Sequence, residues 1–418
     1  CIRDREGVVA RILIAAIGSH GDVAPLTGVG VRLRQAGHQV TIAAFDRFSS
    51  LITASGLHFR GVAEPDTPAQ DADVNVTKGL AEFLAPSGMR SLGAAIISAV
   101  QDVTTDILLL SPFSELAGHP LAEAKGLPAM GIRLQPCSAT SQFPPATLGA
   151  WSAGAAGNRL ASHAGAWLVD RLYGGVVAGF RRELDLPKVS ADKSRKNRTE
   201  SKWTVLHGFS TYVVPRPLDW RPGLEVAGYW WPETDPQWRP APELTDFLAA
   251  GDPPVYFGFG STMTSAADAA RLSEVVRGAV HQAGVRGIMQ TGWAGINADD
   301  DDILSVDELP HSWLFPRMAA VVHHCGAGTT AAGLRAGVPT VAVPGLGDQP
   351  FWAGRLRNLG LSTDTIPQRA LTTERLSEAI RAATTDQELK DRGRRAANVV
   401  GAEDGAAYAV AAIDRLLG

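Results

Sequence analysis

Two apolar runs, one in each half of the chain, each lead into a turn of small residues and then into a helical pattern. The first run is Arg11–Ile17, followed by Gly18–Asp22 and by a helix that we expect to begin at Pro25. The second run is Pro254–Gly260, followed by a helix that we expect over residues 266–283. Continuous apolar runs are typical of buried parallel strands, and their alternation with helices predicts βαβ units. We therefore predict an α/β fold built on two parallel sheets.

The length of the chain favours two domains. It has 418 residues, whereas a single hydrophobic core stops growing near about 250–300 residues. We predict a first domain over residues 10–214 and a second over residues 243–403. Residues 215–242 are rich in proline and tryptophan, which is typical of a stiff linker. Residues 404–418 predict a helix with one apolar face, and the polar residues 190–202 predict a surface loop.

Charge and cysteine content argue against several classes of protein. The chain has 39 Lys and Arg against 43 Asp and Glu, a net charge of −4, so it lacks the basic excess of a nucleic-acid-binding protein. Cys1, Cys137 and Cys325 are too widely spaced for a disulfide framework or a zinc site. No secretory signal is visible in residues 1–9, and the most apolar stretch, residues 92–110, is too polar to span a membrane. We expect a cytoplasmic protein.

The segment Val321–Thr330 carries the strongest local pattern, in which an apolar strand ends in two histidines, a turn of small residues and an alanine-rich helix. Ligands of open α/β sheets bind beyond the carboxyl ends of the strands. Glycines let backbone N–H groups approach a ligand, and a helix N-terminus favours negative charge. With the His324 imidazole and the Thr329 and Thr330 hydroxyls, this turn predicts a diphosphate site. The alternatives are a glycine-rich turn with a threonine N-cap, or a dinucleotide fingerprint, which would lack its ribose-binding acid.

Two further strand ends carry polar groups that we expect to face the same cleft. Ser261 and Thr262 follow the second apolar run, where their hydroxyls suit a second phosphate contact. Asp348 and Gln349 lie in the turn Pro344–Pro350, after another apolar strand. A carboxylate beside an amide suits adjacent sugar hydroxyls, and the alternative for Asp348 is a helix cap.

Together these segments resemble the family 1 nucleotide-sugar glycosyltransferases, above all their sterol glucosyltransferase and glycopeptide-antibiotic glycosyltransferase branch. The resemblance runs from about residue 11 to 365 and rests on His-His-x-Gly-Ala-Gly-Thr-Thr, Gly-Asp-Gln-Pro-Phe-Trp, Gly-Ser-His-Gly-Asp-Val-Ala-Pro and Trp-Leu-Phe-Pro. It implies the GT-B fold, in which two Rossmann-like domains face each other across a cleft. The first domain would bind the acceptor and the second the nucleotide sugar. The final helix, residues 404–418, would cross back onto the first domain.

The resemblance also implies roles for individual residues. The positions that bind the diphosphate of the donor are matched by His324, Gly326, Gly328, Thr329 and Ser261, with Thr262 beside them. Asp348 and Gln349 match the positions that bind the sugar. Trp313 or Leu314 matches the position that binds the nucleobase. Two positions depart from the family pattern. Cys325 replaces a usual glycine, and we interpret it as tolerated packing and not as a nucleophile. Ala332 stands where many members have a ribose-binding glutamate, which leaves UDP and dTDP donors both open.

The implied reaction is inverting and needs one general base and a stabilised leaving group. We favour Asp22 as the base, because it matches the catalytic position of this branch. The rival is His20 as the base with Asp22 as its partner, and the structural alternative is Asp22 as a helix cap. Members with a histidine base usually orient it with an aspartate after a later strand, and the matching position here is Ser111. The resemblance implies no metal and no cofactor besides the nucleotide-sugar co-substrate.

The acceptor is expected to lie against residues 60–150. The residues that we expect to line its pocket are Phe83, Met89, Gln135 and Phe143, with the loop 64–73. These segments are apolar and offer almost no basic residues. They predict a lipophilic acceptor that bears a hydroxyl: a polyketide, macrolide, sterol-like or aromatic aglycone. The abundance of Gly, Ala and Arg suggests a GC-rich bacterial genome and hence secondary metabolism.

Three other functions remain open at this point. The first is a sterol or lipid glucosyltransferase that uses UDP-glucose. The second is a non-enzymatic helper of such a transferase, although the donor motif is complete. The third is an NAD-dependent oxidoreductase, which would bind its nucleotide in the first domain at Gly18–Gly21. For each of them we expect a monomer or a homodimer.

Overall fold

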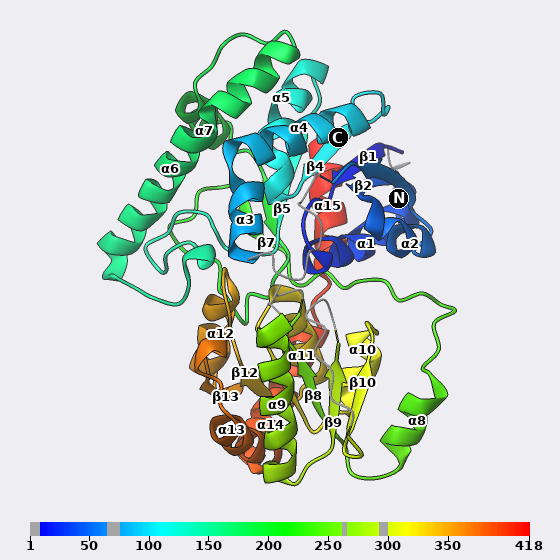
Figure 1. Ribbon diagram of the computed structural model, residues 1–418. Coiled ribbons are helices and arrows are strands. Elements are labelled where there is room, and N and C mark those ends of the chain that lie inside the picture. Colours follow the sequence, from blue (N-terminus) through cyan, green and yellow to red (C-terminus); the bar gives the residue numbers. More distant parts are fainter. Residues whose placement is uncertain (1–8, 65–75, 261–265, 292–299) are drawn as a thin grey trace, which may run out of the picture.

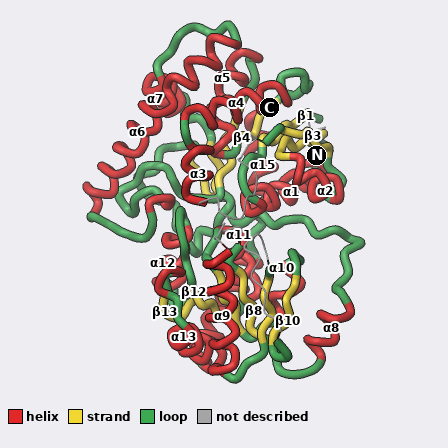
Figure 2. The backbone as a smooth tube through the Cα atoms, in the orientation of Figure 1, coloured by secondary structure: helices red, strands yellow, loops and turns green. Residues whose placement is uncertain are grey.

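The computed structural model describes residues 9–64, 76–260, 266–291 and 300–418. These residues form two α/β units, each a parallel sheet with helices packed against it, one above the other in Figure 1. Figure 2 shows the strands at the centre of each unit and the helices around them. The predicted architecture of two parallel-sheet, Rossmann-like units is confirmed.

The first sheet is parallel throughout, with its seven strands in the order β3-β2-β1-β4-β5-β6-β7. Its strands are β1 (Arg11–Ala15), β2 (Gln39–Phe45), β3 (His58–Val62), β4 (Ile107–Leu110), β5 (Ala129–Arg133), β6 (Val205–His207) and β7 (Leu224–Val226). Ile12 of the central strand β1 pairs with Val40 on one side and Ile107 on the other, and all three are buried. The strand order reverses between β1 and β4, so a ligand is expected at their carboxyl ends.

The helices of the first unit differ from the sequence prediction at two places. They are α1 (His20–Gln35), α2 (Ser49–Ala54), α3 (Val76–Leu84), α4 (Pro86–Val100), α5 (Glu115–Lys125), α6 (Gly154–Glu183) and α7 (Ala191–Glu200). Helix α1 begins at His20 and not at Pro25, because Ser19 and Asp22 form a capping box ahead of the proline. The predicted loop 190–202 is wrong as well. Helix α7 occupies it and packs along α6, where Arg195 Nε donates to Asp170 at 2.8 Å.

The second sheet is also parallel, with its six strands in the order β10-β9-β8-β11-β12-β13. Its strands are β8 (Val255–Gly258), β9 (Gly287–Gln290), β10 (Ile303–Val306), β11 (Ala320–His323), β12 (Thr340–Ala342) and β13 (Ser362–Thr365). The helices beside it are α8 (Pro242–Ala249), α9 (Ala266–Ala283), α10 (His311–Leu314), α11 (Ala327–Ala336), α12 (Gln349–Asn358), α13 (Thr373–Thr385) and α14 (Gln387–Gly401). Here the order reverses between β8 and β11, which defines a second switch point.

The last helix, α15 (Gly405–Leu417), packs against α1 of the first unit (Figure 1). Arg32 Nη2 lies 2.7 Å from Asp404 Oδ2, and the buried His38 lies 3.0 Å from Asp414. The apolar face of α15 enters the core of the first sheet, where Ile413 is fully buried. The extended segment between β7 and α8 crosses α1 at Gly28, where a Cβ would lie 1.8 Å from the Trp231 carbonyl oxygen.

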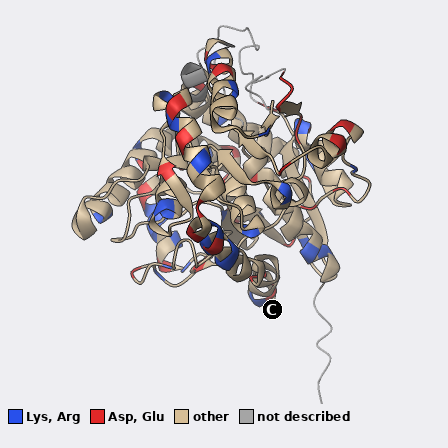
Figure 3. Cartoon of the chain, turned by 90° about the horizontal axis from the view of Figure 1, so that it is seen from below, with Lys and Arg blue, Asp and Glu red and all other residues tan. Residues whose placement is uncertain are grey.

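Charge and hydrophobicity of the described residues are unremarkable for such a fold. Seen from below in Figure 3, basic and acidic residues are interspersed over the helices, in keeping with the small net charge. Among the helices that the structure describes, none is at once long enough and apolar enough to cross a membrane.

Candidate active site

The candidate site lies where the switch points of the two sheets meet. Helix α1 follows β1 in the first unit, and α11 follows β11 in the second. These two helices contact each other although they belong to different units. The turns at their N-termini, residues 18–22 and 323–330, are the two turns that the sequence marked as candidate sites.

The first turn of α1 holds Asp22 in a capping box. The Ser19 backbone N–H and the Ser19 hydroxyl both donate to Asp22 Oδ2, at 2.9 and 2.8 Å. Gly18 packs on the same carboxylate, since a Cβ there would lie 2.5 Å from Asp22 Oδ2, and its φ of +151° also favours glycine. The structural alternative, Asp22 as a helix cap, is therefore present in the fold. It does not exclude a catalytic role, because the capping bonds fix the direction of a carboxylate that stays partly exposed.

His20, the rival base, is paired with a residue of the second unit. Its Nε2 lies 2.9 Å from Oε1 of Glu308, which stands between β10 and α10. The hydrogen bond with His20 lowers the pKa of Glu308. Ser111 instead holds the backbone of the β1 end, where its Oγ accepts the Ile17 N–H at 3.0 Å. The rival hypothesis named Asp22 as the partner of His20, whereas the structure pairs His20 with Glu308, which no local motif marks.

His324 lies between two glycines at the carboxyl end of β11. A Cβ at Gly260 would lie 2.4 Å from the imidazole, and one at Gly326 would lie 2.5 Å from it. The His324 ring Nδ1 is 3.4 Å from the Gly258 carbonyl oxygen. Burial lowers the pKa of His324 to about 4, so the ring is neutral near neutral pH. Ser261 and Thr262, the predicted second phosphate contacts, lie outside the described residues.

The N-terminus of α11 has the small side chains that a bound anion requires. Gly326 is its N-cap, and a Cβ at Gly328 would meet nothing within 4 Å. Thr329 is half-buried, and it precedes the buried Thr330. Free backbone N–H groups at such a helix start attract negative charge. The arrangement suits a diphosphate.

Cys325 is a packed residue with an unusual backbone. Its φ is +61°, in the left-handed region that favours glycine, which explains why a glycine also fits this position. The side chain is fully buried, and burial raises the pKa of its thiol. His323 beside it is also fully buried and accepts the Cys325 N–H on Nδ1 at 3.0 Å. A buried, protonated thiol is a poor nucleophile.

Asp348 brings the two units together. Its Oδ2 accepts the Trp352 indole N–H at 2.8 Å, and the Gln135 side chain from the first unit lies close enough to lower its pKa. Burial raises the pKa of Asp348, and the negative charge of Asp22 raises it further. The residue predicted for the sugar thus lies within electrostatic reach of the predicted base. Gln349 uses its Oε1 to accept the Gly345 N–H at 2.8 Å, which leaves its amide nitrogen for a ligand.

The two candidates for binding the nucleobase of the donor differ in exposure. Leu314 is fully buried, whereas Trp313 is partly exposed beside Arg317, whose guanidinium lies 4.2 Å from the ring centre. Trp238, from the segment between the units, packs edge-on against Trp313 at 5.4 Å. No sequence motif assigns Trp238 to this place. Ala332 of α11 packs in the same cluster as Leu314, so the missing glutamate would have stood next to this aromatic group.

The predicted acceptor residues do not all reach the cleft. Met89 is 4% exposed inside the core of the first unit, so its expected place in a pocket lining is wrong. Phe83 is partly exposed and packs edge-on against Phe113, with ring centres 5.6 Å apart. Phe143 reaches the second unit and contacts Phe351 of α12 at 5.3 Å. The loop 65–75 lies outside the described residues.

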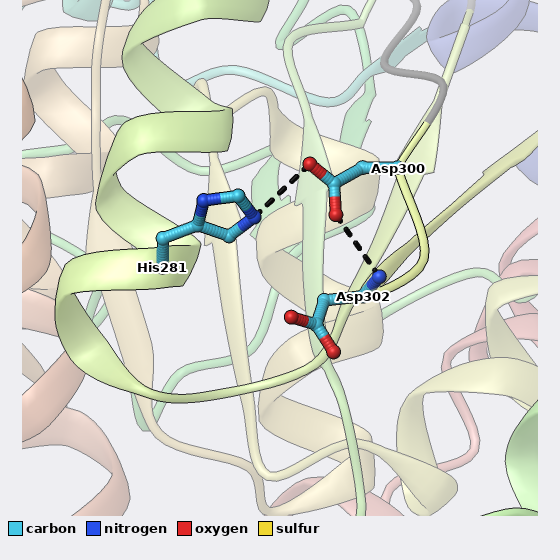
Figure 4. Close-up of side chains that lie close together, drawn as sticks. All are labelled: His281, Asp300 and Asp302. Atoms are coloured by element: carbon cyan, nitrogen blue, oxygen red, sulfur yellow. Dashed lines mark hydrogen bonds and ion pairs between the residues drawn. The ribbon is translucent and has the colours of Figure 1, made fainter.

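A group of metal-ligating side chains lies far from these turns. His281 at the end of α9 has Nε2 3.0 Å from Asp300 Oδ2, and Asp300 Oδ1 accepts the Asp302 N–H at 3.1 Å (Figure 4). The group precedes β10 and therefore lies at the amino edge of the sheet, opposite α11. His281 and Asp300 already bond each other, and the Asp300 carboxylate also accepts the backbone N–H of the turn. It has no part in the chemistry proposed below.

Two family models match the chain. The Glycosyltransferase family 28 N-terminal domain matches residues 12–113, which include Asp22. The Erythromycin biosynthesis protein CIII-like C-terminal domain matches residues 288–411, which include His324 and Asp348. Each candidate turn therefore falls within a matched segment.

Comparison with whole proteins decides the family. The O-mycaminosyltylonolide 6-deoxyallosyltransferase of Streptomyces fradiae is 35% identical over 423 residues, which cover 97% of each chain. The chain belongs to the GT-B glycosyltransferases. A sterol 3-beta-glucosyltransferase of Arabidopsis thaliana is 33% identical to this glycosyltransferase. That match covers 97% of the present chain and 68% of the plant protein. Membership contradicts the NAD-dependent oxidoreductase alternative.

Solved structures agree with this assignment at the level of the fold. Glycosyltransferase VinC, solved in complex with DTDP, matches this glycosyltransferase with a TM-score of 0.68 at 19% identity. The match covers 97% of this chain and 99% of VinC. The sequence-based resemblance to the GT-B enzymes is confirmed.

Replacing His324 by alanine is expected to weaken binding of dTDP or UDP by about 1–3 kcal/mol, because it removes a hydrogen bond to the diphosphate at a desolvated site. Isothermal titration calorimetry measures this loss. The matched control is His163→Ala on the exposed surface of α6, which should leave nucleotide affinity unchanged. Equal affinities of the wild-type enzyme and His324→Ala would contradict the diphosphate assignment.

Proposed function

We propose that this glycosyltransferase transfers a hexose or deoxyhexose from a dTDP- or UDP-linked donor to a hydroxyl of a lipophilic natural product, with inversion at the anomeric carbon. The observation that carries the proposal is the contact between α1 and α11, because it brings the turn that holds Asp22 and the turn that holds His324 to one border between the two units. The His324 turn and the N-terminus of α11 belong to the same border between the two units.

In the proposed reaction Asp22 takes the proton of the acceptor hydroxyl. The acceptor oxygen forms a bond to the anomeric carbon while the bond from that carbon to the diphosphate breaks on the opposite face. The negative charge stays on the diphosphate, where the backbone N–H groups at the start of α11 and the His324 imidazole stabilise it. Since this anion site consists of protein groups, we propose that no metal takes part.

Between the two donor classes, we favour dTDP-sugars. A ribose offers a 2′-hydroxyl that a glutamate can bind, and Ala332 has no such group. The solved structure of VinC with DTDP shows that a protein of this fold accommodates that nucleotide. The sterol 3-beta-glucosyltransferase relative supports the second candidate, a sterol or lipid glucosyltransferase that uses UDP-glucose.

Exposed apolar side chains near α12 support a lipophilic acceptor. Leu346 is 68% exposed two residues before Asp348, and Leu148, in a short helical turn that packs against α12, is 50% exposed. Phe143, a few residues before that turn, contacts Phe351 of α12. The macrolide-type relative from Streptomyces fradiae makes a macrolide-like aglycone in bacterial secondary metabolism the first class to test.

A donor and acceptor panel tests the proposal. The purified enzyme is incubated with dTDP-deoxysugars or UDP-glucose, with macrolide aglycones or sterols, in the presence of EDTA, and products are detected by mass spectrometry. We expect glycosylated macrolide-like products from dTDP-deoxysugars, without added metal. Activity that requires magnesium or manganese would contradict the metal-free mechanism. Transfer from UDP-glucose to sterols alone would establish the second candidate.

A further inference from the structure

A side-chain hydrogen bond between His20 and Glu308 joins the two units at the candidate site. His20 Nε2 and Glu308 Oε1 are 2.9 Å apart, with the two side chains 44% and 59% exposed. Exposed pairs of this kind contribute little to stability. Its position is more informative, because His20 is the first residue of α1 and Glu308 belongs to the donor-side unit.

On the acceptor side, His20 is part of a rigid turn that also carries Asp22. Two hydrogen bonds from Ser19 fix the Asp22 carboxylate, and Gly18 packs on it. A displacement of His20 is therefore expected to displace the Asp22 carboxylate as well.

On the donor side, Glu308 is followed by a firmly packed segment. Three residues on, His311 stacks on Phe315, with ring centres 4.3 Å apart and planes inclined by 15°. Its Nε2 lies 3.3 Å from the Tyr256 hydroxyl, which belongs to β8. Trp313, a candidate for binding the nucleobase of the donor, follows in the same short helix.

Repulsion between carboxylates explains why such a connection is useful. Asp22 and Asp348 stand on opposite units, and their charges interact enough to raise the pKa of Asp348. Like charges disfavour the close approach that transfer requires. A hydrogen bond between the imidazole of one unit and a carboxylate of the other holds the two units together against this repulsion.

We propose that Glu308 is a positioning residue for sugar transfer: through His20 it holds the first turn of α1, and with it Asp22, against the donor-binding unit. The inference rests on the proposed function, since it takes Asp22 as the base. A base acts only within hydrogen-bonding distance of the proton that it abstracts, and a displacement of about 1 Å costs up to about 10²-fold in rate.

A double-mutant cycle tests the connection. Glu308→Ala and His20→Ala are each expected to lower kcat about tenfold, with nucleotide affinity unchanged, because either one breaks the pair and releases the turn. The double variant should lose no more than either single variant, since the two residues act as a unit. Exchanging the pair, with His20→Glu and Glu308→His together, should recover most of the lost rate. The matched control is Asp307→Asn, whose carboxylate accepts the Thr291 hydroxyl at 3.2 Å.

The outcomes separate this inference from the proposed function. If the wild-type enzyme transfers no sugar from any donor, the proposed function fails first. If it transfers sugar but the losses of the two single variants multiply in the double variant, Glu308 and His20 do not act together and the inference is wrong. A shift in the acidic limb of the pH–rate profile in Glu308→Ala would also overturn it, because the imidazole itself would then be taking the proton.

Discussion

Replacing Asp348 by asparagine is expected to lower kcat/KM for sugar transfer about 10²-fold. The Asp348 carboxylate accepts the Trp352 indole N–H at 2.8 Å, and an asparagine oxygen can keep that bond. The amide nitrogen then takes the place of the other carboxylate oxygen. It cannot accept a hydrogen bond from a sugar hydroxyl, and two charge-assisted hydrogen bonds of about 1.5 kcal/mol each correspond to about 10²-fold.

Steady-state kinetics and calorimetry together check this prediction. The affinity for free dTDP or UDP should remain that of the wild-type enzyme, because the free nucleotide carries no sugar. The matched control is Asp364→Asn in β13, where the carboxylate accepts only the adjacent Thr365 N–H among the bonds described, at 2.8 Å. A variant that loses affinity for free nucleotide as strongly as it loses turnover would show that Asp348 does not act on the sugar.

The buried central strands could be predicted from their apolar runs, whereas the partly exposed strands β3 and β13 carry no such run. A parallel strand covered on both faces must be apolar throughout, and the runs at β1 and β8 have this property. The helix boundaries were harder to predict. The helix α1 starts at the capping box between Ser19 and Asp22, which lies ahead of Pro25, the residue predicted to open the helix. The polar helix α7 depends on contacts with α6 that its own sequence does not reveal.

The candidate site could be predicted only in part, for a topological reason. Turns at the carboxyl ends of neighbouring parallel strands meet at one edge of a sheet, so each unit's own turns were predictable. Contacts between the units depend on how the units are placed. For that reason the places of Glu308 and Trp238, and the approach of Gln135 to Asp348, were not predicted. Met89 shows the opposite error, since an apolar side chain suits a pocket lining and a core equally well.

Replacing Asp22 by asparagine is expected to lower turnover about 10²–10⁴-fold, which is the typical contribution of general-base catalysis. The substitution keeps the shape of the side chain. Its amide oxygen can still accept the Ser19 N–H and hydroxyl, so the start of α1 should persist. The amide cannot take a proton from the acceptor hydroxyl. Nucleotide affinity and the melting temperature should both stay close to those of the wild-type enzyme.

A comparison of the Asp22 and His20 variants decides which of the two residues is the general base. His20→Ala should cost only about tenfold, because in this mechanism the imidazole positions the turn and exchanges no proton with the acceptor. Single-turnover rates of the two variants, measured with saturating donor and acceptor, provide the ranking, and unchanged dTDP binding shows that both sites are intact. If His20→Ala is the inactive variant and Asp22→Asn retains most of its rate, the imidazole is the base. Glu308 would then be the carboxylate that orients it, and Asp22 would serve the helix as its cap.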